Sequence, residues 1–137
     1  MSAAESNYRA WLAKAEHDFL NIANNVAAKE VPWDTICSHA QQAAEKLLKG
    51  FLVYHGRPLV RTHDLVALLT RCVEIDPALA ALEERCRALT SVGLDARYPS
   101  DLYEPGEEDG REMIAAARRV RDEVLGRLPA SGSLGSR

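Results

Sequence analysis

The sequence predicts an all-α fold, a five-helix antiparallel (up-down) bundle. Apolar residues recur at spacings of three and four in five separate segments, which is the period of a helical face. Proline and glycine stand between these segments, and no segment shows the alternation of a strand. Each helix then carries one apolar stripe that a neighbour must cover, and short connections make consecutive helices neighbours.

The first two helices follow from their apolar stripes and from the residues at their ends. One stripe starts after Ser6, a suitable N-cap, and ends near Lys29. A second, longer stripe predicts a helix over about 33–55. Gly56 follows where a left-handed residue is wanted, and Pro58 stops the helix. We expect these two helices to form the spine of the bundle.

The second half of the chain predicts three further helices, over 64–75, over 76 to about 93, and over 107–128. Thr62 or His63 is expected near the cap of the first of these, and Asp76 with Pro77 opens the next. The stretch 93–106 contains two prolines and no sustained period, so we expect a loop there.

Length and composition predict one domain. The 137 residues, 47% hydrophobic and 27% charged, suit a single packed core. We expect a helical domain over 1–128 and a flexible tail over 129–137, because the tail is rich in glycine and serine.

Charge and cysteine usage exclude several classes of protein. A net charge of -3 argues against a protein that coats nucleic acid with its whole surface. The three cysteines, Cys37, Cys72 and Cys86, are widely spaced and odd in number, which favours a reducing compartment over a disulfide framework. Neither a signal peptide nor a membrane-spanning run is evident, so we expect a cytoplasmic protein without membrane association.

Common catalytic motifs are absent from the sequence. It contains no phosphate-binding loop of the G-x-x-x-x-G-K-[ST] type, no G-x-G-x-x-G, no H-E-x-x-H and no G-x-S-x-G. The Glu-x-x-His pairs of a di-iron bundle are also missing. We therefore expect no metal and no cofactor.

The four histidines each admit an ordinary structural interpretation. His17 is expected to be solvated or to cap, and His55 to lie at a helix C-terminus, where a cation is favoured. His39, in the middle of the second helix, is more simply a hydrogen-bonded core or interface residue than a ligand. His63 precedes a helix and could cap it.

Two arginine-containing segments could contact nucleic acid. In the loop, the Arg97 guanidinium suits a phosphate and Tyr98 could stack on a base, but a surface turn with an ion pair to Asp95 or Asp101 explains them equally well. The arginines over 118–121 are better explained as a solvated helix face than as an RNA groove.

The segment 37–50, Cys-Ser-His-Ala-Gln-Gln-Ala-Ala-Glu-Lys-Leu-Leu-Lys-Gly, resembles the second helix of the HEPN family. Shorter segments, 14–19, 55–65 and 96–99, support the resemblance. Together they extend it over almost all of 8–128.

This resemblance implies a homodimer with a nucleotide- or RNA-binding cleft, often paired with a minimal nucleotidyltransferase, in a toxin–antitoxin or defence system. On this basis we expect the ligand to be bound by Arg97, Tyr98, His63, Asp64, His39 and Lys46.

Many members of the family are metal-independent endoribonucleases with an arginine followed, after four to six residues, by a histidine. After Arg97 those positions hold Leu102, Tyr103 and Glu104, so the pair is missing there. Arg57 and His63 have the spacing, but Pro58 follows the arginine and the pair lies in a different connection. A binding module is therefore the leading hypothesis, an endoribonuclease toxin that uses Arg57 and His63 is its rival, and a helical scaffold is the third.

Overall fold

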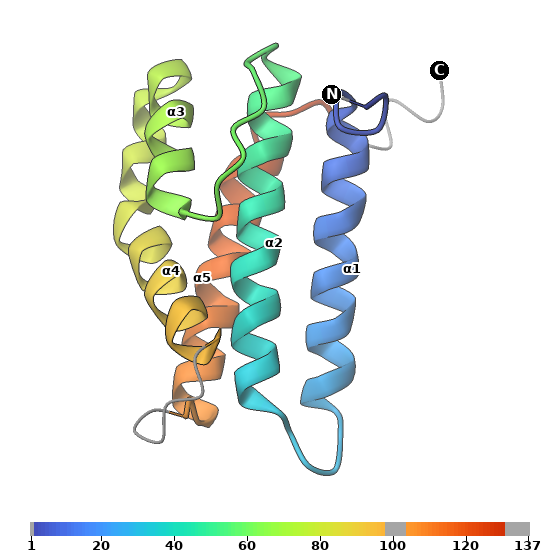
Figure 1. The fold of residues 1–137 in the computed structure, drawn as a ribbon, viewed down its shortest axis with the longest axis vertical. Helices are drawn as coiled ribbons and strands as arrows, with labels where there is room; N and C mark the ends of the chain where they lie inside the picture. The colour runs from blue at the N-terminus through green and yellow to red at the C-terminus, as the bar shows by residue number, and fades with distance from the viewer. Residues whose placement is uncertain (1, 98–103, 131–137) are drawn as a thin grey trace.

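The computed structural model describes the backbone of residues 2–97 and 104–130 and the side chains of 2–91 and 104–130. All regular structure in these ranges is helical, which confirms the predicted all-α bundle (Figure 1). The elements are α1 (Tyr8–Val26), α2 (Trp33–Tyr54), α3 (Leu65–Ile75), a 3₁₀ helix η1 (Pro77–Leu82), α4 (Glu83–Arg97) and α5 (Glu107–Leu125).

The start of α1 differs by one residue from the expectation. Asn7, and not Ser6, is the N-cap, because the Asn7 side chain accepts a hydrogen bond from the backbone N–H of Arg9 at 3.0 Å. The helix also ends at Val26, before Lys29. The predicted end of α2 is nearly right, since His55 is its C-cap and Gly56 has a φ of 72°.

Four boundaries in the second half were wrong. Asp64, and neither Thr62 nor His63, caps α3, because its carboxylate accepts hydrogen bonds from the N–H groups of the first turn. After the Asp76 cap the chain forms the short η1 before α4, and α4 continues past Gly93 to Arg97. A single glycine costs a helix only about 1 kcal/mol, so it need not end one. The last helix, α5, ends three residues before the expected 128.

The second helix lies at the centre of the bundle and packs against α1, α3, α4 and α5 (Figure 1). After α2 ends, the connection 55–64 returns alongside it, so that His63 lies beside Gln41 and Glu45. Further along, the Cys72 thiol of α3 reaches the carbonyl of Leu48. The third helix therefore runs in the same direction as α2, and α5 does so as well, whereas α1 and α4 run in the opposite direction (Figure 1).

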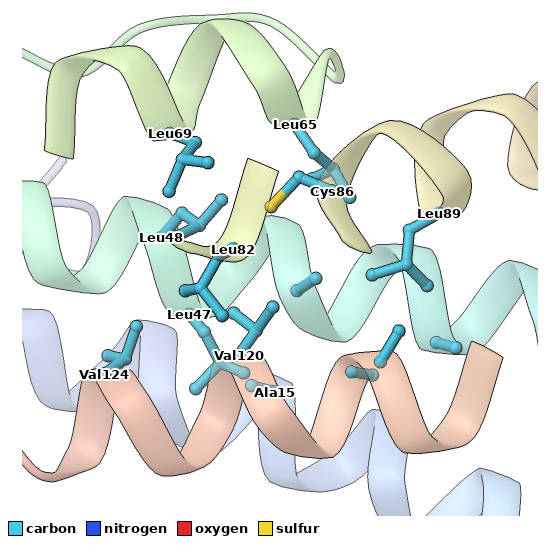
Figure 2. Close-up of a cluster of buried hydrophobic side chains, with 14 of the residues drawn as sticks. Ala15, Leu47, Leu48, Leu65, Leu69, Leu82, Cys86, Leu89, Val120 and Val124 are labelled. Carbon is cyan, nitrogen blue, oxygen red and sulfur yellow. The ribbon is translucent and has the colours of Figure 1, made fainter. Parts of the chain in front are cut away.

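The core surrounds α2 and includes side chains of α1 as well as of the helices that follow α2. Figure 2 shows Leu47 and Leu48 of α2 among side chains from α3, η1, α4 and α5, including Leu65, Leu82, Leu89, Val120 and Val124. Burial also raises the pKa of the Cys37 thiol to about 11, and the pKa values of Cys72 and Cys86 to about 12. These thiols are therefore packing residues rather than nucleophiles.

Candidate functional site

A polar pocket of about 420 Å³ lies on the face of α2 that α3, α4 and α5 leave open. It is lined by Ser38, Gln41, Gln42, Glu45 and Lys46 of α2 and by His63 of the α2–α3 connection. The α2 residues repeat at intervals of three and four, so they form one helical face about 12 Å long. The volume is within the range of small-molecule sites, about 300–1,000 Å³.

Glu45 fixes one end of this pocket. Its carboxylate accepts hydrogen bonds from Lys49 Nζ at 2.9 Å and from His63 Nδ1 at 2.9 Å, and the residue is only 8% exposed. The His63 side chain, in contrast, is 72% exposed. Because Nδ1 donates to Glu45, neutral His63 carries its lone pair on Nε2, and this atom has no partner among the described residues.

Asp18 of α1 makes a second buried ion-pair cluster beside the first. The residue is 4% exposed, and its two oxygens are 2.8 Å from His39 Nδ1 and 2.7 Å from Lys46 Nζ. The ammonium group of Lys46 lines the pocket, and it has three N–H donors, of which Asp18 takes one. Asp18 thus positions Lys46 and leaves it able to donate to a bound anion.

The charges in these two clusters balance. With both histidines neutral, Asp18 and Glu45 cancel Lys46 and Lys49, so the pocket has no formal charge. The pocket offers one ammonium group, an imidazole nitrogen and several amides. It therefore suits a single phosphate together with the polar groups next to it, as in one nucleotide unit.

Three of the predicted ligand residues gather at this site. Lys46 and His63 line the pocket, and His39 is linked to it through Asp18. His39 is half-buried and hydrogen-bonded, as expected for a core or interface histidine rather than a ligand. Asp64, also predicted, uses its carboxylate to cap α3.

The remaining predicted residues are placed elsewhere or are not described. Arg57 forms an ion pair with Glu74 of α3 at 3.0 Å and is not among the pocket residues, so it does not join His63 there. The Arg97 side chain and Tyr98 lie outside the described residues. On α5, Arg119 pairs with Glu123, and Arg121 lies 4.5 Å from the centre of the Phe19 ring. Both arginine side chains therefore already have an interaction partner within the helical domain.

Sequence reasoning missed the two carboxylates that organise the site, Asp18 and Glu45. One signal could have found Asp18: it stands three residues after Ala15 and four before Ile22, within an apolar stripe. A buried acid needs partners, so such a position points to a cation on the neighbouring helix. The pairing of Glu45 with His63 could not be found in this way, because the return of the connection beside α2 has no local pattern; only Lys49, four residues on along α2, is a local partner of Glu45.

Among the described residues, no group of three or more histidine, cysteine or acidic side chains is arranged to hold a metal ion. In the same part of the chain, no helix is both long enough and apolar enough to cross a membrane.

Comparison with known proteins finds one family. The family model described as HEPN domain matches residues 8–128, almost all of the helical bundle. No curated protein and no solved structure matches the chain. At the level of the family, this match supports a nucleotide- or RNA-related module.

Proposed function

The chain belongs to the HEPN domain family, and from this premise we propose that it binds a nucleotide or RNA in the α2 pocket. One observation carries the proposal: Lys46 and His63, from different segments, line a single pocket and are both held by buried carboxylates. Fixing donors in advance reduces the entropy lost on binding.

The geometry suggests how each group is used. The free N–H groups of Lys46 donate to a phosphate, since Asp18 occupies only one of them. The Nε2 atom of His63 accepts a hydrogen bond from a ribose hydroxyl, because Glu45 holds the proton on Nδ1. A phosphate and a ribose are adjacent parts of any ribonucleotide.

We also propose the setting in which this module acts: a homodimer in the cytoplasm, working with a minimal nucleotidyltransferase in a toxin–antitoxin or defence system. The family relationship supports the pairing, and the three unpaired buried thiols suit a reducing compartment. Co-purification with a nucleotidyltransferase encoded beside it would test the partnership, and failure of the two proteins to associate would contradict it.

Binding is tested by calorimetric titration with ATP, GTP and a short RNA at low salt. We expect saturable binding that Lys46→Ala weakens about 10- to 100-fold, the worth of one charge-assisted hydrogen bond. Lys29→Ala is the matched control, because Lys29 is exposed and makes no ion pair among the described residues. No binding by the wild type, or an equal loss in the control, would contradict the proposal. Arg97→Ala tests the predicted loop contact in the same titration.

An endoribonuclease is the second candidate, and the Glu45–His63 pair favours it. A carboxylate that holds Nδ1 of an exposed histidine leaves Nε2 able to take a proton from a ribose 2′-hydroxyl. If the chain cleaves RNA, His63→Ala should abolish cleavage, while His17→Ala, an exposed histidine on α1, should not. Arg57→Ala tests the motif pair, and retention of cleavage would exclude Arg57 from catalysis. If the wild type does not cleave RNA, nucleotide or RNA binding remains as the proposed function.

A further inference from the structure

The buried amide of Gln41 presents a polar atom that the protein does not use. Gln41 is 5% exposed, and its Nε2 donates a hydrogen bond to the backbone carbonyl of His63 at 3.2 Å. A carbonyl only accepts, so the amide nitrogen must face it and the amide oxygen must face away. Among the described residues nothing donates to this oxygen, yet no buried side-chain atom there lacks a partner. The oxygen is therefore open to the pocket that Gln41 lines.

Gln42 repeats this arrangement at the next position. Its Nε2 donates to Ser38 Oγ at 3.1 Å, and its oxygen also accepts no hydrogen bond from any described residue. Both glutamines line the same pocket. The pocket thus offers the amide oxygens of two consecutive residues as acceptors, and each amide uses one of its two N–H groups to bond His63 or Ser38.

We propose that these two amide oxygens select a guanine base. The proposal rests on the nucleotide-binding function proposed above and names the preferred ligand. Two adjacent acceptors require two adjacent donors, and guanine carries an N1–H and a 2-amino group side by side on one edge. Bound in this way, each donor meets one amide oxygen, and the oxygen of Gln41 that the described residues leave unpartnered gains a hydrogen bond.

The other bases fit less well for chemical reasons. Adenine presents one amino donor beside a ring acceptor, so it satisfies only one of the two amide oxygens and brings its ring acceptor against the other. Cytosine places a ring acceptor beside its amino group, and uracil has one N–H between two carbonyls. Each would bring an acceptor against an amide oxygen and leave that oxygen without a donor.

The length of the pocket suits one nucleotide. Gln41 and Lys46 are five residues apart, or about 7.5 Å along α2, with His63 beside both Gln41 and Glu45. A base at the glutamines would place its ribose near His63 and its phosphate near Lys46. The same chemistry is offered by a free guanosine monophosphate and by a guanosine within single-stranded RNA.

The experiment measures base preference by calorimetric titration of the full chain with the 5′-monophosphates of guanosine, adenosine, cytidine and uridine. We expect guanosine monophosphate to bind about tenfold or more tightly than each of the others, the discrimination typical of paired hydrogen bonds to a base edge. Equal affinity for all four would overturn the guanine proposal and leave the proposed binding function standing. No binding of any of them would overturn both.

Variants separate base selection from phosphate binding. Gln42→Met, at a half-buried position, should remove most of the guanine preference with little effect on uridine monophosphate. Gln41→Met should do the same, and thermal unfolding verifies that each variant is folded. Lys46→Ala should weaken all four ligands and keep their order, and Asn24→Ala, an exposed amide on α1, should change nothing. A guanine preference that survives in both glutamine variants would overturn the proposal.

Two RNA trimers that differ only in a central guanosine or adenosine distinguish a free nucleotide from single-stranded RNA as the ligand. Tighter binding of the guanosine trimer than of the monophosphate points to RNA, and the reverse points to a free nucleotide. In either case, guanine selection requires that the guanosine trimer bind more tightly than the adenosine trimer. Equal affinity for both trimers together with equal affinity for all monophosphates would overturn it.

Discussion

The two faces of α2 differ in what holds their side chains in place. On the inner face, Leu47 and Leu48 lie among aliphatic side chains of α3, η1 and α5 (Figure 2). On the open face, Lys46 is held by Asp18, and Glu45 is held by Lys49 and by His63. Apolar packing is non-directional, so many side chains share its stabilisation, whereas the polar face depends on a few directed bonds. The inner face should therefore control stability, and the open face should control binding.

The largest effect is expected on the inner face. Leu47 is fully buried, so Leu47→Ala removes apolar contact and leaves a cavity. We expect a loss of about 2–5 kcal/mol in the free energy of unfolding, measured by urea denaturation. Leu20→Ala is the control, because the Leu20 side chain is 58% exposed and should cost little. A similar small loss for both would contradict the account of the core.

On the open face, the largest loss should follow removal of a shared partner. Asp18→Asn keeps the size of the side chain but removes the charge that holds both His39 and Lys46. We expect a loss of about 1–3 kcal/mol in unfolding free energy, since a partly buried cation loses its partner. Nucleotide binding should weaken as well.

The control for this change is Glu16→Gln, which disturbs a looser, more exposed pair with Arg121 at 3.7 Å. Its effect should stay below about 0.5 kcal/mol. If Asp18→Asn were equally mild, Asp18 would not organise the polar face.

A close contact between α2 and α5 should give an intermediate effect. A Cβ atom at Gly110 would overlap the indole ring of Trp33, whereas a Cβ at Gly106 would meet nothing within 4 Å. We expect Gly110→Ala to lower the free energy of unfolding by about 1–2 kcal/mol, because overpacking outweighs the gain in helix propensity. Gly106→Ala should be nearly neutral in the same thermal unfolding experiment, and equal effects would show that Trp33 can move aside.

The smallest effect is expected at the half-buried ion pair between Asp76 and Arg127, 2.6 Å apart. A hydrogen bond from Arg127 lowers the pKa of the Asp76 carboxyl below its usual 3.8. A carboxyl with a lowered pKa stabilises the fold above its unfolded pKa, and this contribution disappears as the pH falls through the folded value. Asp76→Asn should therefore reduce the loss of stability below about pH 4, in thermal unfolding measured against pH. An unchanged acid profile would show that the pair contributes nothing.

The fold could be predicted from the sequence because apolar periodicity and helix ends are local signals. The stripe that ends at Gly56 and Pro58 placed α2 to within a residue. The predicted helix ends were wrong where two local signals competed, as with Ser6 and Asn7, or where a single glycine, Gly93, was expected to end a helix.

The site was only half predictable, for a different physical reason. Lys46 and His63 were expected as ligand residues from a family resemblance, and they line one pocket. Asp18 and Glu45, which hold them, act across 28 and 18 residues of sequence. Such partnerships depend on how α1 and the connection 55–64 lie against α2, which periodicity does not specify.

The most direct test of the central claim is a titration of isotopically labelled protein with guanosine monophosphate, followed by NMR. We expect the largest shifts at the side-chain amides of Gln41 and Gln42 and at the ring of His63, with little change at Arg119, an exposed residue of α5 that does not line the pocket. Saturable shifts confined to other surfaces, or no shifts at the highest ligand concentration, would contradict the claim that the open face of α2 is the binding site.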